Sequence, residues 1–295
     1  MSAGFIYPGQ GSQTPGMLSD LPNVTSVHET LAEADELLPH GVTDLDSPES
    51  LTQTVGTQLA LLVCGVAATR ALAQQGASPG IVAGHSIGAF AAAVAAGALE
   101  FGEAITAVTH RASRMAELFP HGYGMLTVSG LREVQVRKIV QQTSEEGTPA
   151  WLANVNSFDQ MVLTGTDAAL DRIDELARAA GAHRAQRITV VAPSHAPILR
   201  PVSDELRSIL ADIPERKLVA RYVTISRARP ARTSADVLED LAVSVSHTVR
   251  WRDAFGVITE LGTQFVLQLH QVGSWSASPS QTSWQRASTA STCGL

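Results

Sequence analysis

The pentapeptide Gly84-His85-Ser86-Ile87-Gly88 is the segment of this sequence best suited to chemistry. It lies between an apolar run, 80–84, that predicts a strand and an alanine-rich stretch, 87–98, that predicts a helix. A serine on such a tight turn is exposed above the sheet edge, and the two glycines let the backbone fold closely around it. The first N–H groups of the helix would face an oxyanion formed at Ser86. We interpret Ser86 as a nucleophile; the alternative is a turn of small residues with a capping serine.

A serine nucleophile needs a general base, and His195 is the histidine best placed to be one. It follows a predicted strand, 187–191, at a strand end, where doubly wound sheets carry their functional groups. The alternative is a loop histidine that caps the next helix. His85 adjoins Ser86, but neighbouring side chains on a sharp turn point apart, so we expect it to support the turn. Four other histidines have polar neighbours and are expected at the surface: His28, His40, His121 and His183.

No acidic residue between Ser86 and His195 is an evident third member of a catalytic triad. Most of the Asp and Glu residues in this interval lie on predicted helix faces. Their placement disfavours an ordinary Ser-Asp-His esterase. A Ser–His pair needs no acid if a backbone carbonyl orients the imidazole.

Three further side chains are candidates for lining a site. Arg111 lies on a predicted helix, 103–118, 25 residues after Ser86. A helical arginine is usually solvated or paired at the surface. One that points into a cleft would bind a carboxylate through two parallel hydrogen bonds from its guanidinium. Gln10, in a glycine-rich loop, and Gln58, in a predicted buried helix, could line a site or simply satisfy the backbone.

The order of predicted elements divides the chain in two. Strand, loop and helix alternate in the outer segments, 1–123 and 192–270, which predicts a large α/β domain with a parallel sheet. Between them, segment 124–191 has the order β-α-β-β-α-β of a ferredoxin-like insert. The predicted helices are 26–38, 53–75, 87–98, 103–118, 132–142, 168–180, 198–210, 234–246 and 250–261; the predicted strands are 3–7, 80–84, 125–128, 151–156, 160–164 and 187–191, with another near Leu267.

Six motifs in order resemble the malonyl-CoA:acyl-carrier-protein transacylases over residues 4 to about 270: Pro8-Gly9-Gln10-Gly11-Ser12-Gln13, Thr57-Gln58, Gly84-His85-Ser86-Ile87-Gly88, Arg111, Asn154-Val155-Asn156-Ser157 and Pro193-Ser194-His195. The resemblance implies an α/β-hydrolase-like large domain with a ferredoxin-like insert. It also implies ping-pong transfer of a malonyl group from malonyl-CoA to the phosphopantetheine-type thiol of an acyl carrier protein, without a metal or cofactor.

The resemblance also implies roles for individual residues. Ser86 would be the nucleophile, His195 its base, Gln10 and the Ile87 amide the oxyanion hole, and Arg111 the group that holds the malonyl carboxylate. The imidazole would be oriented by the carbonyl of Ser244, where the family often has glutamine. Four other residues are implied to line the substrate site: Gln58, His85, Asn154 and Asn156.

Within the family, three segments look more like the epsilon subunit of malonate decarboxylase, which would make a carrier subunit of that enzyme the partner: 44–51, 122–125 and 226–229. The alternatives are a malonyl transacylase of fatty-acid or polyketide synthesis, or a serine thioesterase or esterase on the same fold. A chain disabled at its C-terminus, serving only a structural role, is a further alternative.

Composition limits the other possibilities. The chain has 295 residues, of which 44% are hydrophobic, so it can form a sizeable core. A net charge of −7 argues against nucleic-acid binding. With two cysteines, no signal peptide and no apolar run of about 18 residues, we expect a cytoplasmic protein without membrane contact. Segment 271–295 is rich in serine and lacks periodicity, and we expect it to be disordered or frame-shifted.

Overall fold

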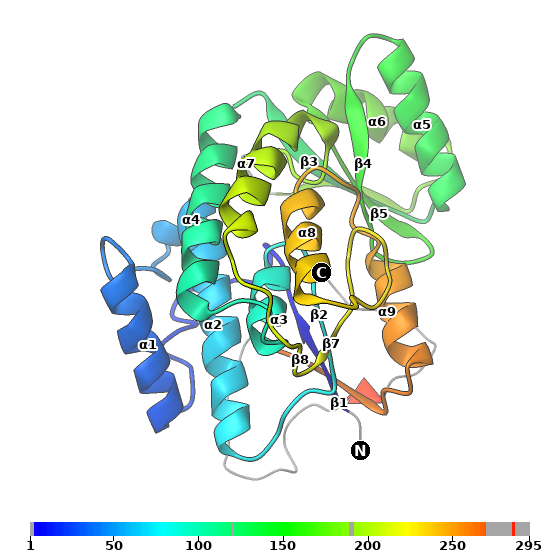
Figure 1. The fold of residues 1–295 in the computed structure, drawn as a ribbon. Coiled ribbons are helices and arrows are strands. Elements are labelled where there is room, and N and C mark those ends of the chain that lie inside the picture. Colours follow the sequence, from blue (N-terminus) through cyan, green and yellow to red (C-terminus); the bar gives the residue numbers. More distant parts are fainter. Residues whose placement is uncertain (1–2, 120, 189–191, 270–284, 287–295) are drawn as a thin grey trace.

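A computed structural model describes residues 3–119, 121–188, 192–269 and 285–286, which form two sheets and the helices that cover them (Figure 1). The strands are β1 (Ala3–Tyr7), β2 (Ile81–Gly84), β3 (Tyr123–Ser129), β4 (Ala150–Val155), β5 (Gln160–Thr166), β6 (Arg184–Ile188), β7 (Arg221–Tyr222), β8 (Phe265–Gln268) and β9 (Gln285–Arg286). The α-helices are α1 (Thr25–Leu37), α2 (Thr54–Gln74), α3 (Gly88–Ala95), α4 (Phe101–Leu118), α5 (Glu133–Glu145), α6 (Asp167–Ala179), α7 (Arg200–Ala211), α8 (Ser234–Ser244) and α9 (Trp251–Glu260). Short 3₁₀ turns lie at Ser50–Thr52 and Pro197–Leu199.

The large sheet has the strand order β7-β2-β1-β8-β9. Its first four strands are parallel, with Tyr7 opposite Gly84 and Phe5 opposite Leu267, and β9 runs antiparallel to β8. β1 and β2 are almost entirely buried, as expected for parallel strands covered on both faces. Residues 271–284 and 287–295 of the tail that was expected to be disordered or frame-shifted, and with them Cys293, lie outside the described residues.

The small sheet has the order β4-β5-β3-β6, and every neighbouring pair in it is antiparallel. Helices α5 and α6 pack on it around a separate apolar core that includes Leu126, Leu163 and Ile173. Together the two sheets confirm the predicted α/β fold class. The strand expected at 187–191 begins instead at Arg184, because β6 pairs with β3 from Ser129 to Met125; residues 189–191 lie outside the described part.

Helix α2 runs through the core of the large domain and is buried on most sides, as its apolar pattern predicts. It corrects the expectation that no segment is long and apolar enough to span a membrane, because its 21 residues pass that test. However, 83% of its apolar 18-residue stretch is buried inside the protein. Its hydrophobic surface is therefore covered by α1, α3 and α4, as in the core helix of a globular domain.

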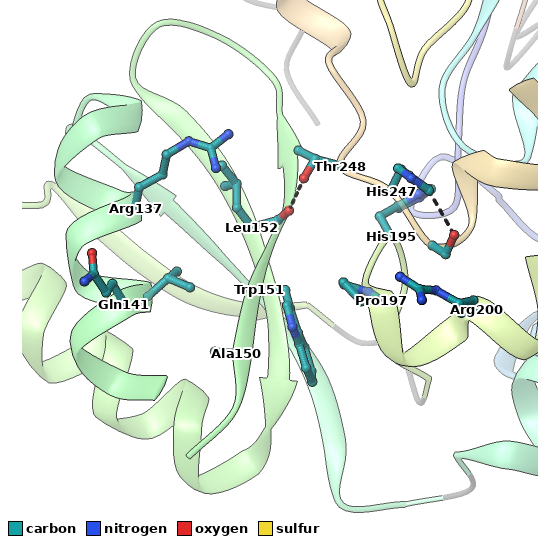
Figure 2. Close-up of a pocket in the computed structure, with 12 residues that line it drawn as sticks. Arg137, Gln141, Ala150, Trp151, Leu152, His195, Pro197, Arg200, His247 and Thr248 are labelled. Carbon is teal, nitrogen blue, oxygen red and sulfur yellow. Dashed lines mark hydrogen bonds between the residues drawn. The ribbon is translucent and has the colours of Figure 1, made fainter. Parts of the chain in front are cut away.

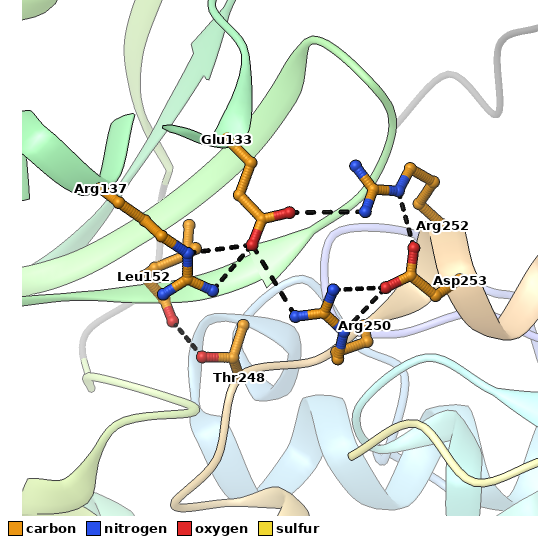
Figure 3. A network of polar contacts seen from close by, with 7 residues as sticks. All are labelled: Glu133, Arg137, Leu152, Thr248, Arg250, Arg252 and Asp253. Atoms are coloured by element: carbon orange, nitrogen blue, oxygen red, sulfur yellow. Dashed lines mark hydrogen bonds and ion pairs between the residues drawn. The ribbon is translucent and has the colours of Figure 1, made fainter. Parts of the chain in front are cut away.

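The chain segment before α9 joins the two sheets. Val249 exchanges backbone hydrogen bonds with β4: its N–H donates to Ala153 O over 2.8 Å and its carbonyl accepts from Val155 N over 2.9 Å. Beside this bridge, Glu133 of α5 pairs with Arg250 and Arg252 at 3.8 and 3.4 Å (Figure 3). The edge of the small sheet is thus hydrogen-bonded to the large domain and bordered by ion pairs.

Candidate active site

The turn between β2 and α3 places Ser86 in a left-handed conformation, with φ of 53°. A non-glycine residue there is strained, and such strain is typical of a nucleophile elbow. Both flanking glycines are sterically required: a Cβ on Gly84 would lie 2.1 Å from the Gly88 backbone, and one on Gly88 would lie 2.3 Å from Tyr7 O. The small residues are therefore needed for strand, turn and helix to pack this closely around Ser86.

His195 meets Ser86 from the other side of the large domain, 109 residues further along the chain. Its Nε2 lies 2.8 Å from Ser86 Oγ, and its Nδ1 lies 2.6 Å from the carbonyl oxygen of Ser244. A carbonyl can only accept, so Nδ1 carries the proton and Nε2 is free to accept one from the serine hydroxyl. The position of His195 at a strand end predicted it as the base, and the family resemblance implied the orienting carbonyl at Ser244; the structure places both atoms at hydrogen-bond distance.

Helix α8, which carries Ser244, is anchored by a buried carboxylate that the sequence analysis missed. Asp240, one turn earlier on α8, accepts hydrogen bonds from the N–H groups of Ile225 and Ser226, both at 3.0 Å, and from Tyr222 Oη at 3.2 Å. These bonds tie α8 to β7 and to the segment that follows it. In sequence Asp240 resembles any polar residue of an amphipathic helix, and it follows a second acidic residue, Glu239, so no local signal marks its buried position.

Arg111 is 1% exposed, so the common expectation for a helical arginine at the surface does not hold here. One guanidinium nitrogen donates to Gln58 Oε1 over 2.5 Å and the other to Ser86 Oγ over 3.4 Å, while Nε has no partner. Among the described residues, no carboxylate pairs with it. Burial lowers the pKa of Arg111 to about 10, which leaves it cationic at neutral pH. A buried cation without a counter-ion beside the serine can bind an anionic group.

The Ile87 N–H, at the start of α3, has no hydrogen-bond acceptor among the described residues. It is the first amide after Ser86, where an oxyanion would form. Gln10 lies half-buried in the loop after β1, and its side chain forms no hydrogen bond within the described part of the chain. That loop approaches the elbow at Gly9, whose Cβ would lie 2.8 Å from His85 Nδ1.

The other predicted lining residues form a second polar group. His85 Nε2 lies 3.3 Å from Asn156 Oδ1 and 3.5 Å from Asn154 Nδ2, and Trp251 packs edge-on against the His85 ring. These contacts link the elbow to β4, consistent with a supporting role for His85. The side chains of Arg111 and His195, by contrast, contact Ser86. The predicted residues therefore form two groups, one around the Ser86 hydroxyl and one around the His85 ring. Trp251 was not among the predicted residues.

Two buried histidines make the protein sensitive to acid. Burial and the charge of Arg111 lower the pKa of His195 to about 3, and burial lowers that of His85 to about 4. Between about pH 6.5 and 4 the unfolded chain therefore binds protons at these residues that the folded protein does not. The two neutral histidines contribute fully to the free energy of unfolding above pH 6.5. This contribution is lost as the pH falls through their pKa values in the folded protein.

Urea denaturation at several pH values between about 7 and 4.5 should show a free energy of unfolding that falls with pH, with a His85→Asn variant falling less steeply. Identical slopes for His85→Asn and the parent protein would contradict the assignment.

Among the described residues, no three His, Cys, Asp or Glu side chains gather closely enough to hold a metal ion. Cys64 is buried in α2, and burial raises its thiol pKa to about 12, as expected of an inert core cysteine. Neither feature adds a chemical group to the Ser86 site.

A serine elbow on a parallel α/β sheet, with an imidazole hydrogen-bonded to the hydroxyl, is the arrangement of serine-dependent acyl-transfer enzymes. Comparison with known proteins gives the family within that class. Residues 4–270 match the family described as "Acyl transferase domain", and the chain belongs to it.

Named relatives and solved structures agree with this membership. The malonyl CoA-acyl carrier protein transacylase of Escherichia coli K12 is 34% identical over 276 residues, covering 91% of this chain and 88% of that protein. The acyl-carrier-protein S-malonyltransferase of Burkholderia pseudomallei has a TM-score of 0.86 at 34% identity, covering 92% and 89%. A malonyl-transacylase solved with its type II PKS acyl-carrier protein also has a TM-score of 0.86, at 31% identity and the same coverage.

Proposed function

We propose that this protein is a malonyltransferase that moves a malonyl group from malonyl-CoA to the thiol of an acyl carrier protein. The observation that carries the proposal is the buried guanidinium of Arg111, which lacks a counter-ion and lies 3.4 Å from the Ser86 hydroxyl. A malonyl thioester has a carbonyl for the serine to attack and a free carboxylate for the arginine to bind. The names of the relatives support the same substrate and acceptor.

In the first half-reaction, Ser86 Oγ attacks the malonyl thioester carbonyl while its proton passes to His195 Nε2. The oxyanion is stabilised by the Ile87 N–H and by Gln10. Collapse breaks the C–S bond, and the departing thiolate takes the proton from His195. Binding of the malonyl carboxylate offsets the positive charge of Arg111, one cause of the low His195 pKa, so the correct substrate makes His195 a better proton acceptor.

In the second half-reaction, the carrier thiol gives its proton to His195 and attacks the malonyl ester. Ser86 leaves as the alkoxide and recovers the proton. The net result is one thioester exchanged for another, without a cofactor. The Ser244 carbonyl holds Nδ1–H throughout, so the imidazole keeps one tautomer for both directions of proton transfer.

The relatives favour a transacylase of fatty-acid or polyketide synthesis over malonate decarboxylase. Each of the three segments that suggest the decarboxylase contains a residue with a defined structural contact or conformation. Asp46 accepts a hydrogen bond from Leu18 N over 2.7 Å, Gly122 adopts φ of 81° before β3, and Ser226 binds Asp240. We retain the decarboxylase carrier as an alternative acceptor, to be tested beside a fatty-acid carrier.

The intact mass after brief mixing with malonyl-CoA tests the function. We expect one malonyl adduct, absent in Ser86→Ala, much less adduct from acetyl-CoA, and release of the group when a holo acyl carrier protein is added. Hydrolysis of malonyl-CoA without transfer would favour a thioesterase. A folded protein that neither forms the adduct nor hydrolyses the thioester would favour the structural role. Transfer only to the carrier subunit of malonate decarboxylase would favour that enzyme.

A further inference from the structure

His195 is held in place by the C-terminal end of α8. Its backbone is left-handed, with φ of 60°, a strained conformation that persists only where the surrounding contacts enforce it. Two carbonyls supply such contacts: Val245 O accepts from the His195 N–H over 2.8 Å, and Ser244 O accepts from Nδ1 over 2.6 Å. The position of His195 therefore depends on where α8 ends.

Packing on the opposite side of the imidazole does not supply this restraint. His195 borders a cavity of about 370 Å³ between the two domains, which Pro197 and His247 also line (Figure 2). A side chain that faces open space has no packed neighbours there to hold it. The hydrogen bonds from the end of α8 must therefore keep the imidazole at Ser86.

Helix α8 is in turn fastened at Asp240. Besides the bonds from Tyr222 Oη and from the N–H groups of Ile225 and Ser226, its buried carboxylate accepts one from Ser226 Oγ over 2.5 Å. Four donors on one buried carboxylate make a strong, directional anchor, because hydrogen bonds to a charged acceptor are stronger than those between neutral groups.

The donors of this anchor lie in β7 and directly after it, and β7 belongs to the sheet that carries the elbow. Tyr222 of β7 lies opposite Val82 of β2 in the parallel register, and β2 ends at Gly84, two residues before Ser86. Asp240 therefore connects the helix that holds the imidazole to the strand next to the one that leads into the serine.

We propose that Asp240 is a positioning residue for acyl transfer: by fixing α8 relative to β2, it keeps His195 Nε2 at 2.8 Å from Ser86 Oγ. The kinetic consequence rests on the proposed function. A displacement of about 1 Å between reacting groups can cost roughly 10²-fold in rate. Ser86 and Arg111 lie on other elements, so loss of the anchor should slow proton transfer and leave malonyl binding in place.

Asp240→Asn tests the proposal, because the amide keeps the shape of the side chain but turns one accepting oxygen into a donor. At saturating malonyl-CoA the acylation rate should fall by roughly 10²-fold, while the half-saturating concentration stays almost unchanged. The matched control is Asp236→Asn, one turn earlier on α8, whose carboxylate accepts from the N–H groups of Arg232 and Thr233 at 2.8 and 3.2 Å. It weakens the N-terminal cap of the same helix and should acylate at the parent rate.

The proton on His195 Nδ1 reports the position of the imidazole directly. Its short hydrogen bond to the Ser244 carbonyl should give a downfield proton resonance in the NMR spectrum, assigned by its absence from His195→Ala. The resonance should be shifted or lost in Asp240→Asn and kept in Asp236→Asn. This measurement needs no substrate, so a parent protein that forms no malonyl adduct would defeat the proposed function without deciding the role of Asp240.

Ser226→Ala is a milder variant that decides the matter if Asp240→Asn does not fold. It removes the shortest bond to the carboxylate, so acylation should slow several-fold, again with little change in the half-saturating concentration. Parent rates and an unchanged resonance in folded Asp240→Asn, or in Ser226→Ala where only that variant folds, would overturn the proposal. Equal rate losses in Asp240→Asn and Asp236→Asn would also overturn it, because they would assign the loss to the general stability of α8.

Discussion

Replacing His195 with alanine is expected to slow acylation by malonyl-CoA by roughly 10⁴-fold, because no other described group is hydrogen-bonded to Ser86 Oγ in a position to accept its proton. The other partner of Oγ is the Arg111 guanidinium, which can only donate. Rapid mixing followed by quenching and intact-mass measurement gives the acylation rate directly. Circular dichroism would verify that the variant is folded, since its imidazole is buried.

Ser244→Ala is the informative companion to this variant. The carbonyl that accepts from His195 Nδ1 belongs to the backbone, so it survives the substitution, and the rate should change only a few-fold. The side chain itself bonds back to Leu241 O over 3.2 Å within its own helix. A loss comparable to that of His195→Ala would contradict orientation by the carbonyl.

Replacing Arg111 with methionine should lower malonyl transfer by roughly 10²–10³-fold, the effect of removing one preorganised charged contact, and leave acetyl transfer almost unchanged. The same variant should unfold at a higher temperature. Arg111 is a buried cation with an unsatisfied Nε, and an apolar side chain of similar length removes that desolvation cost. Competition between malonyl-CoA and acetyl-CoA, together with a thermal melt, measures both effects.

Arg114→Met is the matched control for this substitution. It lies on the same helix one turn later, but is partly exposed and paired with Glu117 and Glu205. Its loss should not change the selectivity between the two acyl groups. Equal losses of malonyl and acetyl transfer in Arg111→Met would remove Arg111 from the carboxylate role, and a lower melting temperature would contradict the account of its burial.

Local sequence patterns were sufficient to predict the elbow and most of the elements. Gly84 and Gly88 flank Ser86 because the turn excludes any Cβ, and that steric requirement is visible in the sequence itself. The helix expected at 87–98 is shorter, ending at Ala95, because Gly97 adopts φ of 76° and terminates it. Element ends depend on such conformations, which a run of alanines does not reveal.

Long-range placement was harder to predict. The direction of Arg111 depends on how α4 packs against α2, and its helical spacing alone favoured the surface. The register of β6 depends on its partner β3 rather than on its own apolar residues. The polar contacts of His85 with Asn154 and Asn156 join segments about 70 residues apart, so only the family resemblance, and no local pattern, connected them.

The backbone bridge at Val249 bears on the construction of chimaeras between related acyltransferases. An exchange confined to the contiguous segment 123–188 would transplant the small sheet without the residue that continues its edge, since Val249 bonds to both Ala153 and Val155 of β4. Thr248 adds a third bond, from its hydroxyl to Leu152 O over 2.7 Å. Grafts should therefore carry residues 248–250 together with the insert, so that β4 and the segment hydrogen-bonded to it come from the same protein.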